Sequence, residues 1–129
     1  MASEVISLGA DLVEIVRVDA LLAQHGQRFL DRVFTRKEQE YCSASPKKQS
    51  ERYAARFAAK EAALKAVGTG WRDGIAWTDV EVVASPSGEP HLCVTGTAAR
   101  FAAERGIRRW LVTLTHTDTH ALASVVACS

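Results

Sequence analysis

Two acidic residues of this 129-residue sequence stand where they could hold a divalent cation. Glu61 lies on the apolar stripe of a predicted helix, with Phe57 one turn before it and Leu64 one turn after it. A carboxylate on a face that turns inward is costly to bury unless it meets a cation or a metal ion. Asp11, at the end of a predicted buried strand, is the natural second oxygen ligand. Two carboxylates, completed by water and phosphate oxygens, form the octahedral environment that Mg²⁺ prefers.

Each carboxylate also has an ordinary structural explanation. Glu61 and Lys65 are one helical turn apart, and such a pair is a common surface arrangement. A lone aspartate after a strand, such as Asp11, is often a turn or capping residue. The spacing by itself leaves these explanations open beside metal binding.

Basic residues around the same helix could grip phosphates. Arg56 and Lys60 are one turn apart and form a cationic edge beside the stripe, while Lys47 and Lys48 lie in the loop before the helix. The alternative is a solvated basic face with no ligand. The helix stops at Gly68-Thr-Gly70, a usual capping sequence that also lets a ligand approach the backbone.

Other kinds of catalytic site find little support in the sequence. His116 and His120 lie among threonines, but no cysteine or third histidine has the spacing of a zinc site, so we expect His116 to act as a hydrogen-bond donor. There is also no Gly-x-Ser-x-Gly elbow and no Gly-rich loop ending in Gly-Lys-Ser/Thr. Serine hydrolases and P-loop enzymes are therefore disfavoured.

The elements that must position these residues in the first half can be predicted from periodicity and capping patterns. Thr35 and Glu38 form a capping box, in which each side chain satisfies a free backbone donor at a helix start. The predicted elements, in order, are a strand at Val5–Leu12, two short helices or one kinked helix within Asp19–Val33 around Gly26, a short helix at Arg36–Cys42, a polar loop at Ser43–Ser50 and a helix from Glu51 to Gly68.

The second half changes to alternating patterns with period two. Its predicted elements are a hairpin of Ala76–Ala84 with Pro90–Thr95, a helix at Thr97–Arg105, and strands at Trp110–Leu114 and Ala121–Ala127. Hairpins mixed with unevenly placed helices favour an α+β fold, with a mainly antiparallel sheet packed against one long helix and several short ones. With no internal repeat and no linker, we expect residues 1–129 to form a single domain.

Composition narrows the setting in which the protein works. The 16 Lys plus Arg nearly balance the 15 Asp plus Glu, so no global field draws the chain to nucleic acid or to a membrane. The cysteines Cys42, Cys93 and Cys128 have no paired spacing and indicate free thiols in a reducing compartment. The first residues lack a signal-peptide pattern, so we expect a cytoplasmic protein.

Taken together, the motifs resemble those of a known family. They are Gly9-Ala-Asp11 followed by Glu14 and Arg17, then Phe34-Thr-Arg-Lys-Glu38, then Arg56-Phe-Ala-Ala-Lys-Glu-Ala-x-x-Lys65 with Gly68-Thr-Gly70, and Leu114-Thr-His-Thr117. In this order and spacing the set resembles holo-acyl-carrier-protein synthases, the small bacterial type of 4'-phosphopantetheinyl transferase. The resemblance covers essentially the whole chain.

The resemblance implies transfer of 4'-phosphopantetheine from coenzyme A to a serine of apo-acyl carrier protein, in support of fatty acid biosynthesis. Asp11 and Glu61 would hold Mg²⁺ against the pyrophosphate, and Lys65 would contact the pyrophosphate or steady Glu61. The general base stays open between Glu61, Asp11 and a metal-bound water. Which carrier is preferred, and whether acylated coenzyme A is accepted, the sequence does not decide.

The resemblance also implies how substrates and subunits are arranged. The family is typically a homotrimer with active sites between subunits, so the His116 strand of one chain would lie against the helix of another. The acidic carrier protein would meet Arg17, Arg28 and Arg32. The residues implied around coenzyme A are Lys47, Lys48, Arg56, His116 and Thr117 on the nucleotide side, and Gly68, Thr69, Gly70 and Pro90 on the pantetheine side.

Two rival functions remain. One is a coenzyme A or nucleotide-binding protein that keeps the fold without turnover, although intact Asp11, Glu61 and Lys65 count against it. The other is a small RNA-binding module with a basic face made of Arg28, Arg32, Lys47 and Lys48. The sequence lacks the interleaved aromatic and basic residues expected on an RNA-binding strand, which counts against this function.

Overall fold

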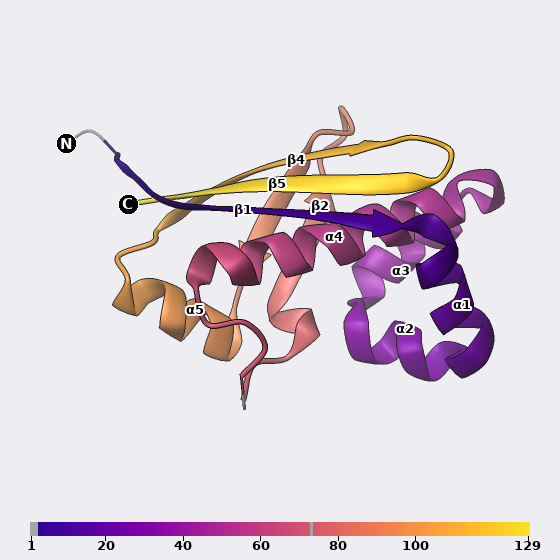
Figure 1. Cartoon of the computed structure of the whole chain (residues 1–129), viewed down its shortest axis with the longest axis horizontal. Coiled ribbons are helices and arrows are strands. Elements are labelled where there is room, and N and C mark those ends of the chain that lie inside the picture. The colour runs from indigo at the N-terminus through magenta and orange to yellow at the C-terminus, as the bar shows by residue number, and fades with distance from the viewer. Residues whose placement is uncertain (1–2, 73) are drawn as a thin grey trace.

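The computed structural model describes residues 3–72 and 74–129, which form an α+β structure as the sequence predicts. A layer of long strands lies over the helix α4, and the shorter helices gather at the two ends of α4 (Figure 1). The elements are β1 (Val5–Glu14), α1 (Ile15–His25), α2 (Gln27–Val33), α3 (Arg36–Ser43), η1 (Pro46–Lys48), α4 (Gln49–Val67), η2 (Trp77–Asp79), β2 (Val80–Ala84), β3 (Pro90–Val94), α5 (Gly96–Glu104), β4 (Arg109–His116) and β5 (His120–Cys128).

The strands form two antiparallel sheets. The larger sheet has the order β1-β5-β4, and β2 pairs with β3 in a separate hairpin. In β1, Gly9 faces Val125 and Asp11 faces Ala123 of the central strand. Since side chains alternate across a strand, Gly9, Asp11 and Val13 share one face, which is the face that meets α4.

Helix α4 lies so close to this sheet because small side chains separate them. From Tyr53 to Val67 every residue of α4 except Glu61 and Lys65 is buried. A Cβ added to Gly9 would lie 1.9 Å from the carbonyl oxygen of Ala62, so only glycine fits there. The buried alanines of the helix are Ala54, Ala55, Ala58, Ala59, Ala62, Ala63 and Ala66.

Local signals predicted several boundaries correctly. The capping box at Thr35 is present, with the Thr35 side chain accepting from the Glu38 backbone N–H. The helical region of the first half is two helices, broken at Gly26 with φ of 57°. Helix α4 ends at Gly68, which takes the left-handed conformation with φ of 88°.

Other boundaries differ from the predictions. Strand β1 continues to Glu14, because Glu14 still pairs with His120, and Asp11 is therefore inside the strand and not at its end. The loop before α4 contains the 3-10 turn Pro46–Lys48. The predicted strand at Ala76–Ala84 begins only at Val80, after the 3-10 turn η2.

Lys60 was predicted to lie on a cationic edge, and this prediction is wrong. Its side chain is fully buried, and its Nζ lies 2.8 Å from Oε1 of Glu38, which is also fully buried. Nζ also donates to the carbonyls of Trp77 and Val80, while Oε2 of Glu38 accepts from the Val82 backbone N–H at 2.8 Å. Burial lowers the pKa of Lys60, and the Glu38 carboxylate opposes this effect. The pair fastens α3, η2 and β2 to α4, and removing one partner from such a pair costs about 3–5 kcal/mol.

No helix in the described part of the chain combines the length and the apolar character needed to cross a lipid bilayer.

Candidate active site

Asp11 and Lys65 meet where β1 crosses α4. Nζ of Lys65 lies 3.2 Å from Oδ1 of Asp11 and donates to the carbonyl of Ala10 at 3.0 Å. The Asp11 side chain is 19% exposed and that of Lys65 is 55% exposed, so the pair borders solvent. The alternative of a surface pair between Glu61 and Lys65 is thus replaced by a contact between Lys65 of the helix and Asp11 of the strand.

Glu61 lies one turn before Lys65 and is half-buried. Its Oε2 accepts a hydrogen bond from Nε1 of Trp71 at 3.3 Å. Gly9 packs on Ala62 and Ser7 Oγ donates to the carbonyl of Ala66 at 2.5 Å, so β1 runs along α4 toward the N-terminus of the helix. Asp11, two residues beyond Gly9 on the same face, therefore extends toward the turn that carries Glu61.

The carboxylate oxygens of Asp11 and Glu61 suit a hard cation. The hydrogen bonds within the described residues engage Oδ1 of Asp11 and Oε2 of Glu61, which leaves one oxygen of each carboxylate for an ion. Among residues 3–72 and 74–129, no three His, Cys, Asp or Glu side chains gather into a metal-binding cluster. An ion held here would take two protein ligands and fill its other positions with water or substrate oxygens, as Mg²⁺ commonly does.

A second group of predicted residues lies at the other end of α4. Lys48, Arg56 and His116 line one cavity of about 220 Å³, which we call the α4 cavity. Nδ1 of His116 lies 3.2 Å from Oε2 of Glu51, so the end of β4 contacts the first turn of α4 in the same chain. Arg52 also lines this cavity.

Arg56 is the buried cation of the α4 cavity. Only 4% of the residue is exposed, and its guanidinium lies 4.3 Å from the ring centre of Tyr41. Arg52 stacks on the same ring at 4.2 Å and donates to the Tyr41 carbonyl at 2.8 Å. The buried Nε of Arg56 has no hydrogen-bond partner among the described residues. A buried donor without a partner is costly. The Arg56 side chain also lines the cavity, where its positive charge would attract an anion.

Helix α4 presents the two groups on different sides. Arg56 and Glu61 are five positions apart, which is roughly 140° around the axis of a helix with 3.6 residues per turn. One ligand therefore cannot contact both Arg56 and Glu61 from a single side of α4.

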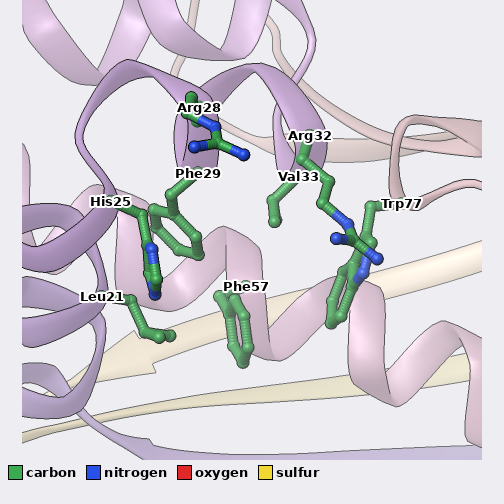
Figure 2. Close-up of a pocket in the computed structure, with 8 residues that line it drawn as sticks. All are labelled: Leu21, His25, Arg28, Phe29, Arg32, Val33, Phe57 and Trp77. Carbon is green, nitrogen blue, oxygen red and sulfur yellow. The ribbon is translucent and has the colours of Figure 1, made fainter.

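The three arginines predicted to meet a carrier protein surround Phe57. Arg28 and Arg32 line a cavity of about 560 Å³ between α1, α2 and α4, which we call the α1–α2 cavity. Arg17 lies over the Phe57 ring at 6.0 Å. Figure 2 shows Arg28 and Arg32 above the cavity, His25 beside it and Phe57 at its floor. The cavity therefore combines a cationic rim with an apolar floor.

The remaining predicted residues line none of these three places. Lys47 is exposed in η1, and Pro90 is half-buried at the start of β3. Thr117 Oγ1 accepts from the backbone N–H groups of Thr119 and His120, so Thr117 shapes the turn between β4 and β5.

The glycine segment after α4 has a capping role in the structure. Gly68 is the left-handed C-cap, and Arg105 covers the helix end by donating to the carbonyls of Ala66 and Val67 at 2.8 and 2.7 Å. Thr69 Oγ1 donates to the carbonyl of Gly70 at 3.0 Å.

Three residues near these groups were not predicted from the sequence: Arg52, Tyr41 and Trp71. Arg52 stands one turn before Arg56, so helical spacing did contain a signal for it. Tyr41 and Trp71 come from other segments, and only the folded chain brings them to the helix.

The chain matches a known family model. The model of the 4'-phosphopantetheinyl transferase superfamily matches residues 7–123. The holo-[acyl-carrier-protein] synthase of Gloeobacter violaceus is 45% identical over 118 residues, which cover 92% of this chain and 89% of that protein.

Solved structures show the same likeness. The holo-[acyl-carrier-protein] synthase of Neisseria meningitidis is 32% identical with a TM-score of 0.84, covering 96% of this chain and 98% of that one. The holo-(acyl-carrier-protein) synthase of Bacillus anthracis, solved in complex with CoA (3',5'-ADP), is 30% identical with a TM-score of 0.79 and covers 99% of both chains.

Proposed function

This chain belongs to the 4'-phosphopantetheinyl transferase superfamily, and we propose that it transfers 4'-phosphopantetheine from coenzyme A to a serine of an apo-acyl carrier protein. The serine oxygen bonds to the phosphorus that carries the pantetheine, and the P–O bond of the pyrophosphate breaks. Adenosine 3',5'-bisphosphate leaves, and the hydroxyl proton passes to a base. The observation that carries this proposal is the convergence of Lys48, Arg56 and His116 on the α4 cavity.

In this reaction the α4 cavity binds the phosphates of the nucleotide. Arg56 lines the cavity with a buried positive charge, and the exposed Lys48 adds a second positive charge. Lys47 extends this charge from η1, and Thr117 stands beside His116 at the end of β4. Gly68, Thr69, Gly70 and Pro90 would line the pantetheine side of the site.

Asp11 and Glu61 would hold Mg²⁺ through the oxygen that each leaves free. When bound, Mg²⁺ offsets the charge that develops on the leaving phosphate. Lys65 forms an ion pair with Asp11 and is partly exposed to solvent. It therefore adds a hydrogen-bond donor next to the oxygens that would hold the metal ion. Together Asp11, Glu61 and Lys65 form the catalytic group of this proposal.

The α1–α2 cavity suits the acidic carrier protein. Arg17, Arg28 and Arg32 place positive charge around it, and charge complementarity steers association while an apolar centre contributes affinity. The Phe57 floor supplies that apolar centre.

We propose that the protein works as a homotrimer whose active sites lie between subunits. One support is the angle of roughly 140° around α4 between Arg56 and Glu61. A site between two copies could combine Arg56 of one copy with Glu61 of its neighbour. A second support is the outer face of the larger sheet, where Leu8, Leu12 and Leu111 are 67%, 61% and 52% exposed. Exposed apolar surface of this kind marks an interaction site.

We further propose that residues 1–129 act as one domain, located in the cytoplasm and serving fatty acid biosynthesis. The three free cysteines Cys42, Cys93 and Cys128 fit a reducing compartment.

The proposed activity is tested by a mass measurement. The protein is incubated with coenzyme A, Mg²⁺ and apo-acyl carrier proteins of fatty acid, polyketide and peptide synthesis, and the carrier should gain the mass of the phosphopantetheine arm. Omitting the metal should abolish the gain. Glu61→Gln should keep the fold but lose metal-dependent transfer, because the amide lacks the charge that a hard cation needs. Glu104→Gln, on the exposed end of α5, is the matched control.

The same assay separates the proposal from its rival. A protein that binds coenzyme A by calorimetry yet modifies no carrier would be a non-catalytic binding protein of this fold. Transfer at the wild-type rate by Glu61→Gln would remove Glu61 from the metal site.

A further inference from the structure

The indole of Trp71 touches a carboxylate to which the proposed function assigns the metal ion. Trp71 Nε1 donates to Oε2 of Glu61 at 3.3 Å. Trp71 lies beyond the C-cap of α4, whereas Glu61 lies within the helix, so the hydrogen bond joins the following segment back to α4.

The Trp71 ring is held in place by stacking. It stacks on Trp77 with ring centres 3.9 Å apart and planes 28° apart, and Trp77 stacks on Phe57 at 5.1 Å. The carbonyl of Trp77 in turn accepts a hydrogen bond from the buried Lys60 at 3.2 Å. The indole N–H is thus aimed at Glu61 by a row of rings that is anchored in the core.

We propose that Trp71 is a positioning residue, which holds one oxygen of Glu61 and thereby presents the other to Mg²⁺. This inference rests on the proposed function. A glutamate side chain has three torsions, and fixing one carboxylate oxygen removes much of the entropy cost of binding an ion. An indole N–H can only donate, so it orients the carboxylate without competing for the metal. Carboxylates that bind metal ions commonly have such a hydrogen-bonding partner.

A purely structural role would leave the metal unaffected. A half-buried tryptophan usually finds an acceptor for its N–H, and Glu61 could serve only for that purpose. The experiment must therefore measure metal binding directly as well as activity.

The first measurement compares wild type with Trp71→Phe, which keeps an aromatic ring over Trp77 and removes the N–H. Calorimetry with Mg²⁺ in the presence of adenosine 3',5'-bisphosphate and without carrier gives the metal affinity. We expect Trp71→Phe to weaken Mg²⁺ binding about tenfold, at the lower end of what loss of such a partner costs a metal site. Trp110→Phe on β4 is the matched control and should bind Mg²⁺ like wild type.

The second measurement is the indole N–H resonance of Trp71 in the wild-type protein. Mg²⁺ with adenosine 3',5'-bisphosphate should shift this resonance, and the shift should vanish in Glu61→Gln. If Trp71→Phe fails to fold, the resonance is assigned by elimination with Trp77→Phe and Trp110→Phe.

The outcomes separate this inference from the proposed function. Wild-type Mg²⁺ affinity in folded Trp71→Phe, or a static Trp71 resonance while Glu61→Gln still loses the metal, overturns the positioning role alone. Unchanged Mg²⁺ binding in Glu61→Gln overturns the metal role of Glu61 and the inference with it.

Discussion

At the scale of the residue, Arg56 is the side chain whose environment most directly demands a ligand. Its guanidinium is buried against Tyr41, and its Nε lacks a partner among the described residues. Arg56 also lines the α4 cavity together with Lys48 and His116, so this cavity is suited to an anion. Sequence reasoning placed Arg56 beside phosphates, but it did not predict that the residue would be buried.

Replacing Arg56 by lysine should raise the KM for coenzyme A by about tenfold or more. The change keeps the positive charge but removes the planar donor set, and a hydrogen bond to a charged group is worth about 1.5–3 kcal/mol. Steady-state kinetics with coenzyme A as the varied substrate checks this. Arg36→Lys, at a side chain that is 93% exposed, should leave the KM unchanged. An unchanged KM in folded Arg56→Lys would contradict the assignment.

Cys42 should make the protein less stable at high pH. Burial raises the pKa of Cys42 from 9.0 to about 12, so between these values the unfolded thiol loses its proton while the folded thiol keeps it. The contribution of Cys42 to the free energy of unfolding is therefore fully present below pH 9. It is lost as pH rises toward 12, by about 1.4 kcal/mol per pH unit.

Urea unfolding of wild type and Cys42→Ala between pH 8 and pH 10.5 measures this effect. The cavity left by alanine lowers stability at every pH. Above pH 9, however, the free energy of unfolding should fall less steeply with pH in Cys42→Ala than in wild type. Parallel slopes would exclude Cys42 as the titrating group.

Exposed Cys93 should react with a thiol reagent at pH 8 while Cys42 stays protected.

At the scale of the element, the contact between β1 and α4 depends on Gly9. An added Cβ would overlap the carbonyl oxygen of Ala62, and backbone cannot move aside as a flexible side chain can. We expect Gly9→Ala to lose more than about 3 kcal/mol of unfolding free energy. Urea unfolding at a fixed protein concentration checks this, because an oligomer makes stability depend on concentration.

Gly26→Ala is the matched control for Gly9→Ala. Its new Cβ would meet nothing within 4 Å, so only the positive φ of 57° is strained, at about 1–3 kcal/mol. If Gly9→Ala were as stable as Gly26→Ala, the close approach of β1 to α4 would not be required for folding.

The accuracy of the predicted elements follows the range of the interactions that fix them. The Thr35 capping box, the break at Gly26 and the cap at Gly68 are local, and the sequence predicts all three. The end of β1 at Glu14 depends on His120, more than a hundred residues away, and the prediction stopped too early. Lys60 is buried because Glu38 on another helix neutralises it, which helical spacing alone could not reveal.

At the scale of the whole molecule, the proposed shared sites predict complementation between defective subunits. Glu61→Gln removes the metal side of a site and His116→Ala removes the nucleotide side, so each variant alone should be nearly inactive. Mixed trimers formed by co-refolding equal amounts should recover about a quarter of the wild-type rate, since each site draws its two sides at random from two chains. The mass-shift assay measures this rate.

Native mass spectrometry of the mixture, which distinguishes trimers of different subunit composition by their mass, shows whether the subunits have exchanged. A mixture that gives only the sum of the two parent rates, with exchange demonstrated, would mean that each site is built within one chain. The sequence predicted the residues on both sides, and their five-residue spacing on α4 already sends Arg56 and Glu61 in different directions.

The order of the larger sheet also has a consequence for how the protein is made. Strand β5 lies between β1 and β4, yet it follows helices α1 to α5 along the chain. A nascent chain on the ribosome therefore exposes β1 with both of its edges unpaired until the central strand arrives. Pairing across so long a separation is slow and leaves the intermediate prone to aggregation. Synthesis of this small enzyme should thus depend on chaperones more than its size suggests.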